Sequence, residues 1–587
     1  MINFKLLGDN KKEDFLLEIF KNRGFTSDQS IKEYLFTKDN KIEKYTDLDN
    51  IEDGVCLLKK HLDNGSKMLI VVDCDVDGFT SSAVLYNFLK EIDPNVNLRY
   101  VLHEGKQHGF SEDLYEDVYA EKYDLILMPD AGSNDYEQHK RLKDNGTDII
   151  IIDHHEAPYV SEDAVIINNQ LSKNYENKCL SGVGVVWHFI ECFNEMCRTN
   201  INIDKYLDLV ALGNIADIMD VRAIETKQLI LKGLKNIHNK FLQVACKQQE
   251  YSLKGKLTSE SIGWYIAPYL NAMIRVGEKA QKEQLFESLL SENENRLVPS
   301  TKRGHKPGDT EDYQEQTFRL CSNARNKQNK IVEEGMQYIE EKIAEKQLMK
   351  NKVLIITIPN DRIMPEVVGL VANKIASEYQ QPTLILRECE DTFAGSGRNF
   401  NYSPLEDFRG FLDESGYMEL AQGHASAFGV ALKKENLSPL VEYCNKKLKD
   451  LSFSPTPFVD FEFDMEDESD KNKIGDCLST IGQLNEMGVY GQGLKEPLIF
   501  IRNITVNDLA IYSKKTVTGK IIGDKGVNYL KFNADKEELE SLTPSFIIKK
   551  INVLGRVNVN EFNNRISYQV IIEDYEKSQQ GKVIYDF

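Results

Sequence analysis

Long apolar runs, a secretory leader and paired cysteines are all missing from this sequence. The longest apolar runs, Met68–Val72 and Ile149–Ile152, fall far short of the roughly 20 residues that a membrane-spanning helix needs. The first residues, Met1-Ile-Asn-Phe-Lys5, lack the basic, apolar and small-residue order of a secretory signal. None of the ten cysteines forms a Cys-x-x-Cys pair, which favours reduced thiols over a disulfide framework. We therefore expect a cytoplasmic protein with no membrane partner.

A surplus of basic residues is also missing, because the formal net charge is −21. Taken alone, this argues against a nucleic-acid partner, since phosphate binding normally appears as a basic patch. Net charge is a global quantity, however, and binding is local. Carboxylates gathered at a metal site count as acidic although cations neutralise them there. The charge therefore leaves a nucleic-acid partner open, and the motifs must decide.

The composition is that of a folded, multidomain protein. Its 587 residues correspond to about four domains at roughly 150 residues each. Aromatics make up 9 % of the chain, and many Ile, Val and Leu runs can outweigh the entropy of ordering. We predict five parts, with boundaries at an N-terminal segment (1–50), an α/β unit (51–225), a helical region with a connecting helix (226–350), a second α/β unit (351–452) and a β-rich domain (453–587).

The α/β units follow from apolar runs that alternate with amphipathic stretches, a pattern typical of a parallel sheet. The strands expected in the first unit are 68–72, 98–102, 125–128 and 149–152, with a helix over 80–92. The second unit has strands at 353–357 and 383–386 and a helix over 367–379, and a long charged helix is expected over 323–350. Five later β-prone runs, at 497–506, 516–522, 527–532, 551–557 and 566–572, suit a small oligonucleotide-binding (OB) barrel.

Acidic residues recur where the predicted strands of the first unit end. Asp73, Asp75 and Asp77 follow one strand, Asp130 follows another, and Asp153-His154-His155 follow a third. A fourth acidic element, Gly213-Asn-Ile-Ala-Asp217, comes later. The carboxyl ends of parallel strands share one crevice, so these groups should converge. Any single Asp after a strand is most often a helix cap or turn residue, and Asp77 before Gly78 fits that interpretation.

Four carboxylates in one crevice require cations, because like charges a few ångströms apart raise one another's pKa strongly. Two divalent ions would balance Asp73, Asp75, Asp130 and Asp217. Oxygen ligands with one imidazole favour Mn²⁺ or Mg²⁺, and the imidazole makes Mn²⁺ the better choice. Two such ions form the usual clamp for hydrolysing phosphate esters.

The four elements, Asp73-Cys-Asp-Val-Asp-Gly78, Asp130-Ala-Gly132, Asp153-His-His155 and Gly213-Asn-Ile-Ala-Asp217, resemble the ordered motifs of the DHH phosphoesterase superfamily. The resemblance implies metal ligation by Asp73, Asp75, Asp130, His154 and Asp217, with Asp130 bridging two ions. It also implies that His155 lies near the scissile phosphate and that Asp153 orients the imidazoles. Asp130, His155 and Asp153 are accordingly the expected catalytic residues.

The remainder of the chain resembles the RecJ branch of that superfamily. Gly395-Ser396-Gly-Arg398 and Gly423-His424-Ala425 look like the DHHA1 domain, and glycines of this kind let backbone amides approach phosphate oxygens. Pro268-Tyr-Leu-Asn271-Ala-Met-Ile-Arg275 is similar to a RecJ segment, which implies that Asn271 and Arg275 face the nucleotide path. Gly491–Pro497 resembles the entry into the RecJ OB domain. The expected phosphate-binding residues are thus Asn271, Arg275, Ser396, Arg398, Gly423 and His424.

The resemblance implies a metal-dependent 5′→3′ exonuclease for single-stranded DNA, active in DNA repair, recombination or replication. Single-strand-binding protein or a helicase would be further partners. Two alternatives stay open: an oligoribonuclease or dinucleotide phosphodiesterase, and a non-catalytic DHH scaffold. A scaffold would be expected to lose motif residues, whereas all four acidic elements are present. Basic residues between Lys302 and Lys330 give weak further support for a bound strand, because a charge run is usually a solvated face.

Overall fold

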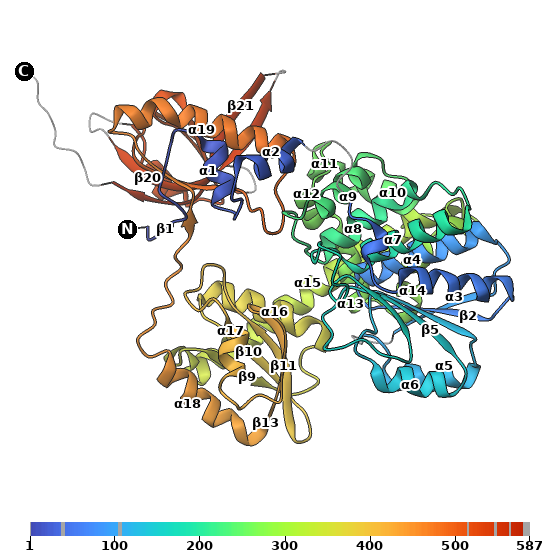
Figure 1. Ribbon diagram of the computed structural model, residues 1–587. Helices are drawn as coiled ribbons and strands as arrows, with labels where there is room; N and C mark the ends of the chain where they lie inside the picture. Colours follow the sequence, from blue (N-terminus) through green and yellow to red (C-terminus); the bar gives the residue numbers. More distant parts are fainter. Residues whose placement is uncertain are drawn as a thin grey trace, which may run out of the picture.

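The computed structural model describes residues 2–36, 42–103, 108–513, 516–544, 549–562 and 565–578. Three large β-sheets, each with its own helices, form three bodies; a helical region joins the first two, and an irregular segment joins the second and third (Figure 1). Within the described residues, no helix combines the length and apolar character that crossing a bilayer requires.

The first sheet is parallel throughout, as predicted, and has the strand order β3-β2-β4-β5-β6. Its strands are β2 (Met68–Val72), β3 (Leu98–Leu102), β4 (Leu125–Pro129), β5 (Asp148–Asp153) and β6 (Val165–Asn168). Strand β6 was not predicted. Alternate residues of the central strands enter two separate apolar cores, one on each face. Burial on both faces explains why these strands read as continuous apolar runs.

Helices cover both faces of this sheet. They are α3 (Ile51–Asp63), α4 (Val76–Ile92) and α7 (Gly182–Cys197) on one face, and α5 (Glu112–Glu121) and α6 (Tyr136–Asp144) on the other. A helical region follows, with α8 (Leu207–Ala216), α9 (Ile224–Lys235), α10 (Lys240–Gln248), α11 (Glu250–Leu253), α12 (Ser259–Tyr265), α13 (Ala267–Val276) and α14 (Lys279–Ser288).

The long connecting helix is α15 (Tyr313–Glu345), which starts and ends earlier than the predicted 323–350. Its start is fixed by Asp312, whose side chain accepts hydrogen bonds from the backbone N–H groups of Gln314 and Glu315. Along its length α15 packs against α13 of the first body and then against α16 (Pro365–Tyr379) of the second. It therefore links the two bodies through side-chain packing as well as through the chain.

The second sheet has the order β12-β13-β11-β10-β9. Its strands are β9 (Leu354–Ile358), β10 (Thr383–Glu388), β11 (Thr392–Arg398), β12 (Leu420–His424) and β13 (Ala427–Lys433), with helices α16, α17 (Phe408–Asp413) and α18 (Leu437–Lys447) beside it. The glycine-rich Gly395–Arg398 stretch lies in strand β11. A Cβ at Gly395 would clash with the backbone oxygen of Ile385 on β10, so this glycine is required by close strand packing.

The third sheet has seven strands in the order β15-β16-β20-β21-β19-β18-β17. Its strands are β15 (Phe461–Asp464), β16 (Leu498–Thr505), β17 (Asp508–Ser513), β18 (Val517–Ile522), β19 (Asn528–Phe532), β20 (Lys550–Phe562) and β21 (Arg565–Lys577), with α19 (Glu468–Glu486) and α20 (Lys536–Glu540). All five predicted β-prone runs form strands here. The short strands β15 and β17 were missed.

The N-terminal segment packs on the third body, far away in sequence (Figure 1). Strand β1 (Lys5–Leu6) pairs in parallel with β14 (Phe458–Val459), and α1 (Phe15–Lys21) and α2 (Asp28–Phe36) follow it. Arg23 forms a buried ion pair with Asp460, with an N–O distance of 2.7 Å. Such long-range pairing leaves no local pattern, which is why only helices could be expected for this segment.

Candidate active site

The first acidic motif lies in the turn between β2 and α4. Asp73 directly follows the buried strand and is itself 2 % exposed. Asp75 caps α4, since its Oδ1 accepts from the backbone N–H of Gly78 at 2.9 Å. Asp77 accepts from the Ser181 hydroxyl at 3.0 Å and from the Gly182 N–H at 2.7 Å, at the start of α7. The interpretation of Asp77 as the cap of the helix before Gly78 is therefore wrong, because Asp75 caps α4 and Asp77 lies inside it. Asp77 instead binds the start of α7, and its carboxylate lies within 4.8 Å of ligand atoms of His154 and Asp217.

Asp130 ends β4 in a left-handed conformation, with φ at 70°. Its backbone N–H donates to the carbonyl oxygen of Ile152 at 2.8 Å, which ties the turn to strand β5. Gly182, the first residue of α7, lies directly against the Asp130 side chain and leaves no room for a Cβ. Gly182 was not predicted as a site residue, although the Ser181-Gly-Val-Gly184 run before a helix is a sequence signal for close approach.

Asp153 holds the two histidines that follow it. Its carboxylate accepts from the backbone N–H of His154 at 2.7 Å and from Nδ1 of His155 at 2.8 Å. Burial alone would raise the pKa of Asp153, but the hydrogen bond and charge of His155 hold that pKa below its usual range. The same contact outweighs burial at His155 and raises its pKa to about 9. Burial lowers the pKa of His154 to about 4, which leaves a neutral imidazole free to bind a metal.

The predicted metal ligands converge at one place. Nε2 of His154 lies 3.3 Å from Oδ1 of Asp130 and 3.4 Å from Oδ2 of Asp217. Asp73, Asp75 and Asp130 each offer an oxygen within 4.8 Å of the others. We call Asp73, Asp75, Asp130, His154 and Asp217 the acidic site.

The chemistry of the acidic site fits bound divalent cations. Within the described part of the chain, Oδ1 of Asp130 and Nε2 of His154 are buried and make no hydrogen bond. Burial and the neighbouring carboxylates raise the pKa values of Asp130 and Asp217 well above their usual range. Without cations, the site therefore retains protons that a metal would displace. The oxygen-rich donor set with one imidazole suits Mn²⁺ or Mg²⁺.

A basic pair lies beside the acidic site. Arg275 is on α13, and Arg398 ends β11 in the second body. Burial lowers the pKa of Arg275, while the charge of Asp75 acts in the opposite direction. Burial also lowers the pKa of Arg398, and the charge of Arg275 lowers it further. Arg275 therefore lies close enough to interact electrostatically with both Asp75 and Arg398. We call the guanidinium groups of Arg275 and Arg398 the arginine pair.

Arg398 is held by backbone oxygens, since its Nη1 donates to Gly397 at 2.7 Å and to Phe428 at 3.3 Å. A Cβ at Gly369 on α16 would lie 2.5 Å from Nη2 of Arg398, so this glycine makes room for the guanidinium. Gly369 was not predicted as a site residue. Ser396 lies close by, with its Oγ 3.4 Å from the same Cβ position.

The other predicted phosphate-binding residues lie around this pair. Asn271 is half-buried on α13, the helix that carries Arg275. Gly423 and His424 are exposed at the end of β12, where Gly423 has φ at 129°. In the sheet register, Arg398 and His424 flank the same residue of β13, Ala427, from opposite sides. His424 on β12 thus lies two strands from Arg398 on β11, with β13 between them.

The basic residues that gave weak support in the sequence are mostly engaged within the protein. Lys302 pairs with Glu315 at 2.9 Å, and Lys330 lies 3.8 Å from Glu334. The Arg325 guanidinium lies over the Tyr269 ring, 4.3 Å from its centre. Of these residues, Arg303 and Lys306 lie on an exposed loop. The simpler interpretation, a solvated charged face, accounts for most of them.

Comparisons with known proteins agree with this site and fold. Residues 67–214 match the family model "DHH family, N-terminal domain", and residues 475–574 match "RecJ OB domain". The chain is 35 % identical, over the full length of both proteins, to a Bacillus subtilis (strain 168) SPbeta prophage protein, YorK, which carries the provisional name of a single-strand DNA-specific exonuclease. It is 26 % identical to the single-stranded-DNA-specific exonuclease RecJ of Bacillus subtilis, over 95 % of this chain and 67 % of that protein.

The fold is also that of a solved structure, RecJ from Thermus thermophilus in complex with Mn²⁺. The TM-score is 0.71 at 19 % identity, with 96 % of this chain and 76 % of that chain covered. The parallel sheet with its acidic strand ends defines a DHH-type protein, and the match to the RecJ OB domain narrows this class to RecJ-like proteins. The chain belongs to the RecJ-like family of single-strand DNA-specific exonucleases. The expected α/β architecture with an OB-type domain is confirmed.

Proposed function

We propose that this chain is a metal-dependent exonuclease that digests single-stranded DNA from its 5′ end by a two-metal mechanism. The observation that carries the proposal is the convergence of Asp73, Asp75, Asp130, His154 and Asp217, with Asp130 Oδ1 and His154 Nε2 left unpaired. Full-length similarity to a protein named for this activity supports the choice of substrate.

In this proposal Asp73, Asp75, Asp130, His154 and Asp217 would hold two divalent cations, Mn²⁺ or Mg²⁺, and Asp130 would be a ligand of both. When bound, such a pair supplies an ionised water and stabilises charge that develops on the phosphate. Asp153 positions both imidazoles through its hydrogen bonds. His155 is about half exposed and carries a proton at neutral pH, so it presents a positive charge to the scissile phosphate.

The arginine pair, with Asn271 and Ser396, would bind the phosphates of the strand. Arginine donates charge-assisted hydrogen bonds to phosphate oxygens, and burial strengthens them. Gly423 and His424, two strands from Arg398 in the second sheet, would contact the next part of the backbone. The OB-type domain would hold the remaining strand by stacking bases on aromatic side chains.

The proposed division of the chain is an N-terminal segment (1–50), a DHH catalytic domain (51–225), a helical region with the connecting helix (226–350), a DHHA1 domain (351–452) and an OB-like domain (453–587). The pairing of β1 with β14 and the Arg23–Asp460 ion pair attach the N-terminal segment to the last of these domains. A cytoplasmic role in DNA repair, recombination or replication, beside single-strand-binding protein or a helicase, completes the proposal.

The test is digestion of a 5′-phosphorylated single strand in Mn²⁺, with the label at either end in parallel reactions. Digestion from the 5′ end releases a labelled mononucleotide at once from the 5′-labelled strand. The 3′-labelled strand shortens progressively instead. A duplex of the same sequence should resist. The opposite label pattern would overturn the proposed polarity.

Two further substrates separate the alternatives. A dinucleotide cleaved at least about tenfold faster than the long strand, in kcat/KM, would favour the dinucleotide phosphodiesterase. Binding of the strand without cleavage in Mn²⁺ or Mg²⁺ would favour the non-catalytic scaffold.

A further inference from the structure

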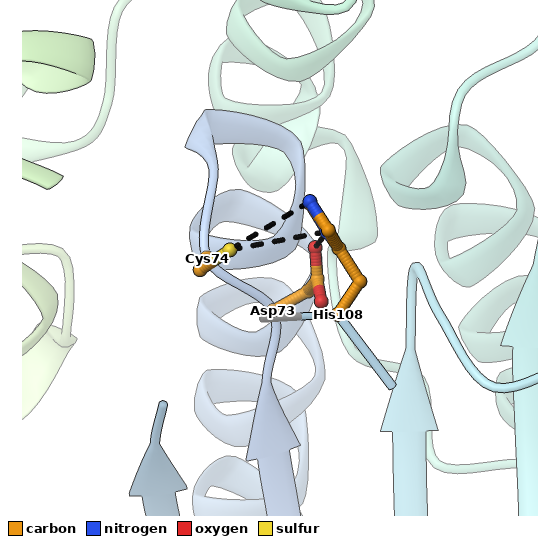
Figure 2. A group of neighbouring side chains, drawn as sticks. All are labelled: Asp73, Cys74 and His108. Atoms are coloured by element: carbon orange, nitrogen blue, oxygen red, sulfur yellow. Dashed lines mark hydrogen bonds and ion pairs between the residues drawn. The ribbon is translucent and has the colours of Figure 1, made fainter. Parts of the chain in front are cut away.

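A thiol lies at the edge of the acidic site, in a cluster that shares Asp73 with that site but adds two side chains that the proposed mechanism does not use. Asp73 and Cys74 directly follow β2, and His108 approaches them from the segment before α5 (Figure 2). Nδ1 of His108 lies 2.7 Å from Oδ2 of Asp73. The Cys74 sulfur lies 3.9 Å from both ring nitrogens of His108. All three residues offer a ligand atom within 4.8 Å of the others.

The three donors are of three different kinds: a carboxylate, a thiol and an imidazole. Mn²⁺ and Mg²⁺ prefer oxygen, whereas a thiolate selects softer ions such as Zn²⁺. Zinc commonly takes three protein ligands and keeps a fourth position for water. Its bond lengths put tetrahedral N, O and S donors about 3.3–3.8 Å apart. The observed 2.7 Å and 3.9 Å separations lie on either side of that range, so small side-chain rotations would produce the geometry.

We infer that Asp73, Cys74 and His108 form a binding site for a thiol-seeking divalent cation of the zinc type, and that this cation inhibits the nuclease. The cation site itself is independent of the proposed function, while its inhibitory effect rests on that function.

Inhibition follows because Asp73 belongs to both clusters. In the acidic site, a carboxylate oxygen of Asp73 lies within 4.8 Å of oxygens of Asp75 and Asp130. Asp73 also supplies the carboxylate of the cluster with Cys74 and His108. Two cations in the acidic site would neutralise its four carboxylates, and they would repel a third cation a few ångströms away. Binding of zinc at Cys74 would therefore lower the affinity of the acidic site for manganese, and binding of manganese would lower the affinity for zinc by the same factor.

Substitution of Cys74 can test this cation site without affecting another potential metal cluster that contains a cysteine in the described residues. It is partly exposed, so a cation can reach it from solvent. Within the described residues, it is the only cysteine that shares such a cluster with two other potential ligands. Cys56, an exposed free cysteine on α3, lies outside any of these clusters and offers a matched control.

The first experiment needs no DNA. The full-length protein is titrated with Co²⁺, a spectroscopic substitute for zinc, and the near-ultraviolet absorption from thiolate-to-cobalt charge transfer is followed. We expect one equivalent of this absorption in the wild type and in Cys56→Ser, and none in Cys74→Ser. His108→Asn should weaken Co²⁺ binding by about tenfold or more. The same absorption in Cys74→Ser, or none in the wild type, would overturn the inference.

The second experiment measures Zn²⁺ inhibition of Mn²⁺-supported digestion of a single strand, with each protein normalised to its own zinc-free rate. Zinc can also displace manganese from the acidic site, so inhibition alone is not informative. We expect the half-inhibitory Zn²⁺ concentration to rise at least about tenfold in Cys74→Ser, a change of about 1.4 kcal/mol, and to stay unchanged in Cys56→Ser. Equal inhibition of all three proteins would refute the inhibitory role.

The two readouts distinguish failure of the inference from failure of the proposed function. Cobalt absorption without any nuclease activity would leave the cation site standing and remove the exonuclease. Digestion without thiol-dependent absorption would do the reverse. Equal thermal unfolding midpoints for the wild type, Cys74→Ser and His108→Asn, measured in EDTA, would show that the variants fold.

Discussion

The acidic site and the arginine pair differ in how the chain builds them. The acidic site lies within one body, where the start of α4 holds Asp75 and where backbone N–H groups hold the neighbouring carboxylates of Asp77 and Asp153. The arginine pair spans α13 of the first body and β11 of the second, and backbone oxygens hold Arg398. The proposed metal centre is therefore contained in one body, whereas the proposed strand binding depends on how two bodies are placed.

The largest expected effect comes from breaking the acidic site at Asp130. Asn fits the left-handed φ of 70° that Asp130 adopts, and it removes only the charge. We expect Asp130→Asn to lower kcat by about a thousandfold or more, because the bridging charge contributes several kcal/mol to the transition state. Asp144→Asn, at an exposed end of α6, is the matched control and should retain full activity.

A strand assay at saturating substrate would measure both rates. If Asp130→Asn kept more than about a tenth of the wild-type kcat, a role for Asp130 as a bridging ligand would be untenable.

His155 sharpens the comparison because it belongs to the acidic motif yet carries a positive charge. His155→Gln should lower kcat by about a hundredfold or more, the usual cost of removing one group that stabilises charge in the transition state. The wild-type rate should fall as the pH rises through about 9, where the imidazolium loses its proton. That alkaline limb should vanish in His155→Gln. An unchanged pH profile in the variant would show that another group titrates.

Much of this comparison could be predicted from the sequence. The acidic motifs are local, so strand ends such as Val72 and Pro129 predicted where Asp73 and Asp130 would lie. His108 was missed because its contact with Asp73 depends on how a distant segment folds over β2. The pairing of β1 with β14 was missed for the same reason, since two-residue strands have no periodicity to detect. Strand β11 was not predicted, because its glycines, which serve close strand packing, were interpreted as an element that approaches phosphate.

Breaking the arginine pair should have a smaller effect, mainly on binding. Arg398→Gln should lower kcat/KM by about tenfold to a hundredfold, as expected for one charge-assisted contact to phosphate. The slope of log affinity against log salt concentration should fall by about one. Arg303→Gln, in the exposed basic loop, is the control and should change neither quantity. Equal effects at both positions would mean that general charge, and not the arginine pair, binds the strand.

The smallest expected effect is on stability. The folded-state pKa values of Asp130 and Asp217 are raised, so the unfolded chain releases these protons first as the pH rises above about 4. In EDTA, the unfolding midpoint of the wild type relative to that of Asp130→Asn should therefore fall as the pH rises above about 4. Mn²⁺ should reverse this fall, because it binds the ionised carboxylates of the folded state. A midpoint difference that rose with pH in EDTA would contradict the raised pKa values.

The most direct test measures cation binding and strand binding separately in the same two variants. Mn²⁺ bound per chain is counted by electron paramagnetic resonance, and strand affinity is measured in EDTA to prevent cleavage. We predict that Asp130→Asn loses manganese but keeps the strand, while Arg398→Gln keeps two manganese ions and binds the strand about tenfold or more weakly. Loss of both properties in either variant would contradict the division of labour between the acidic site and the arginine pair.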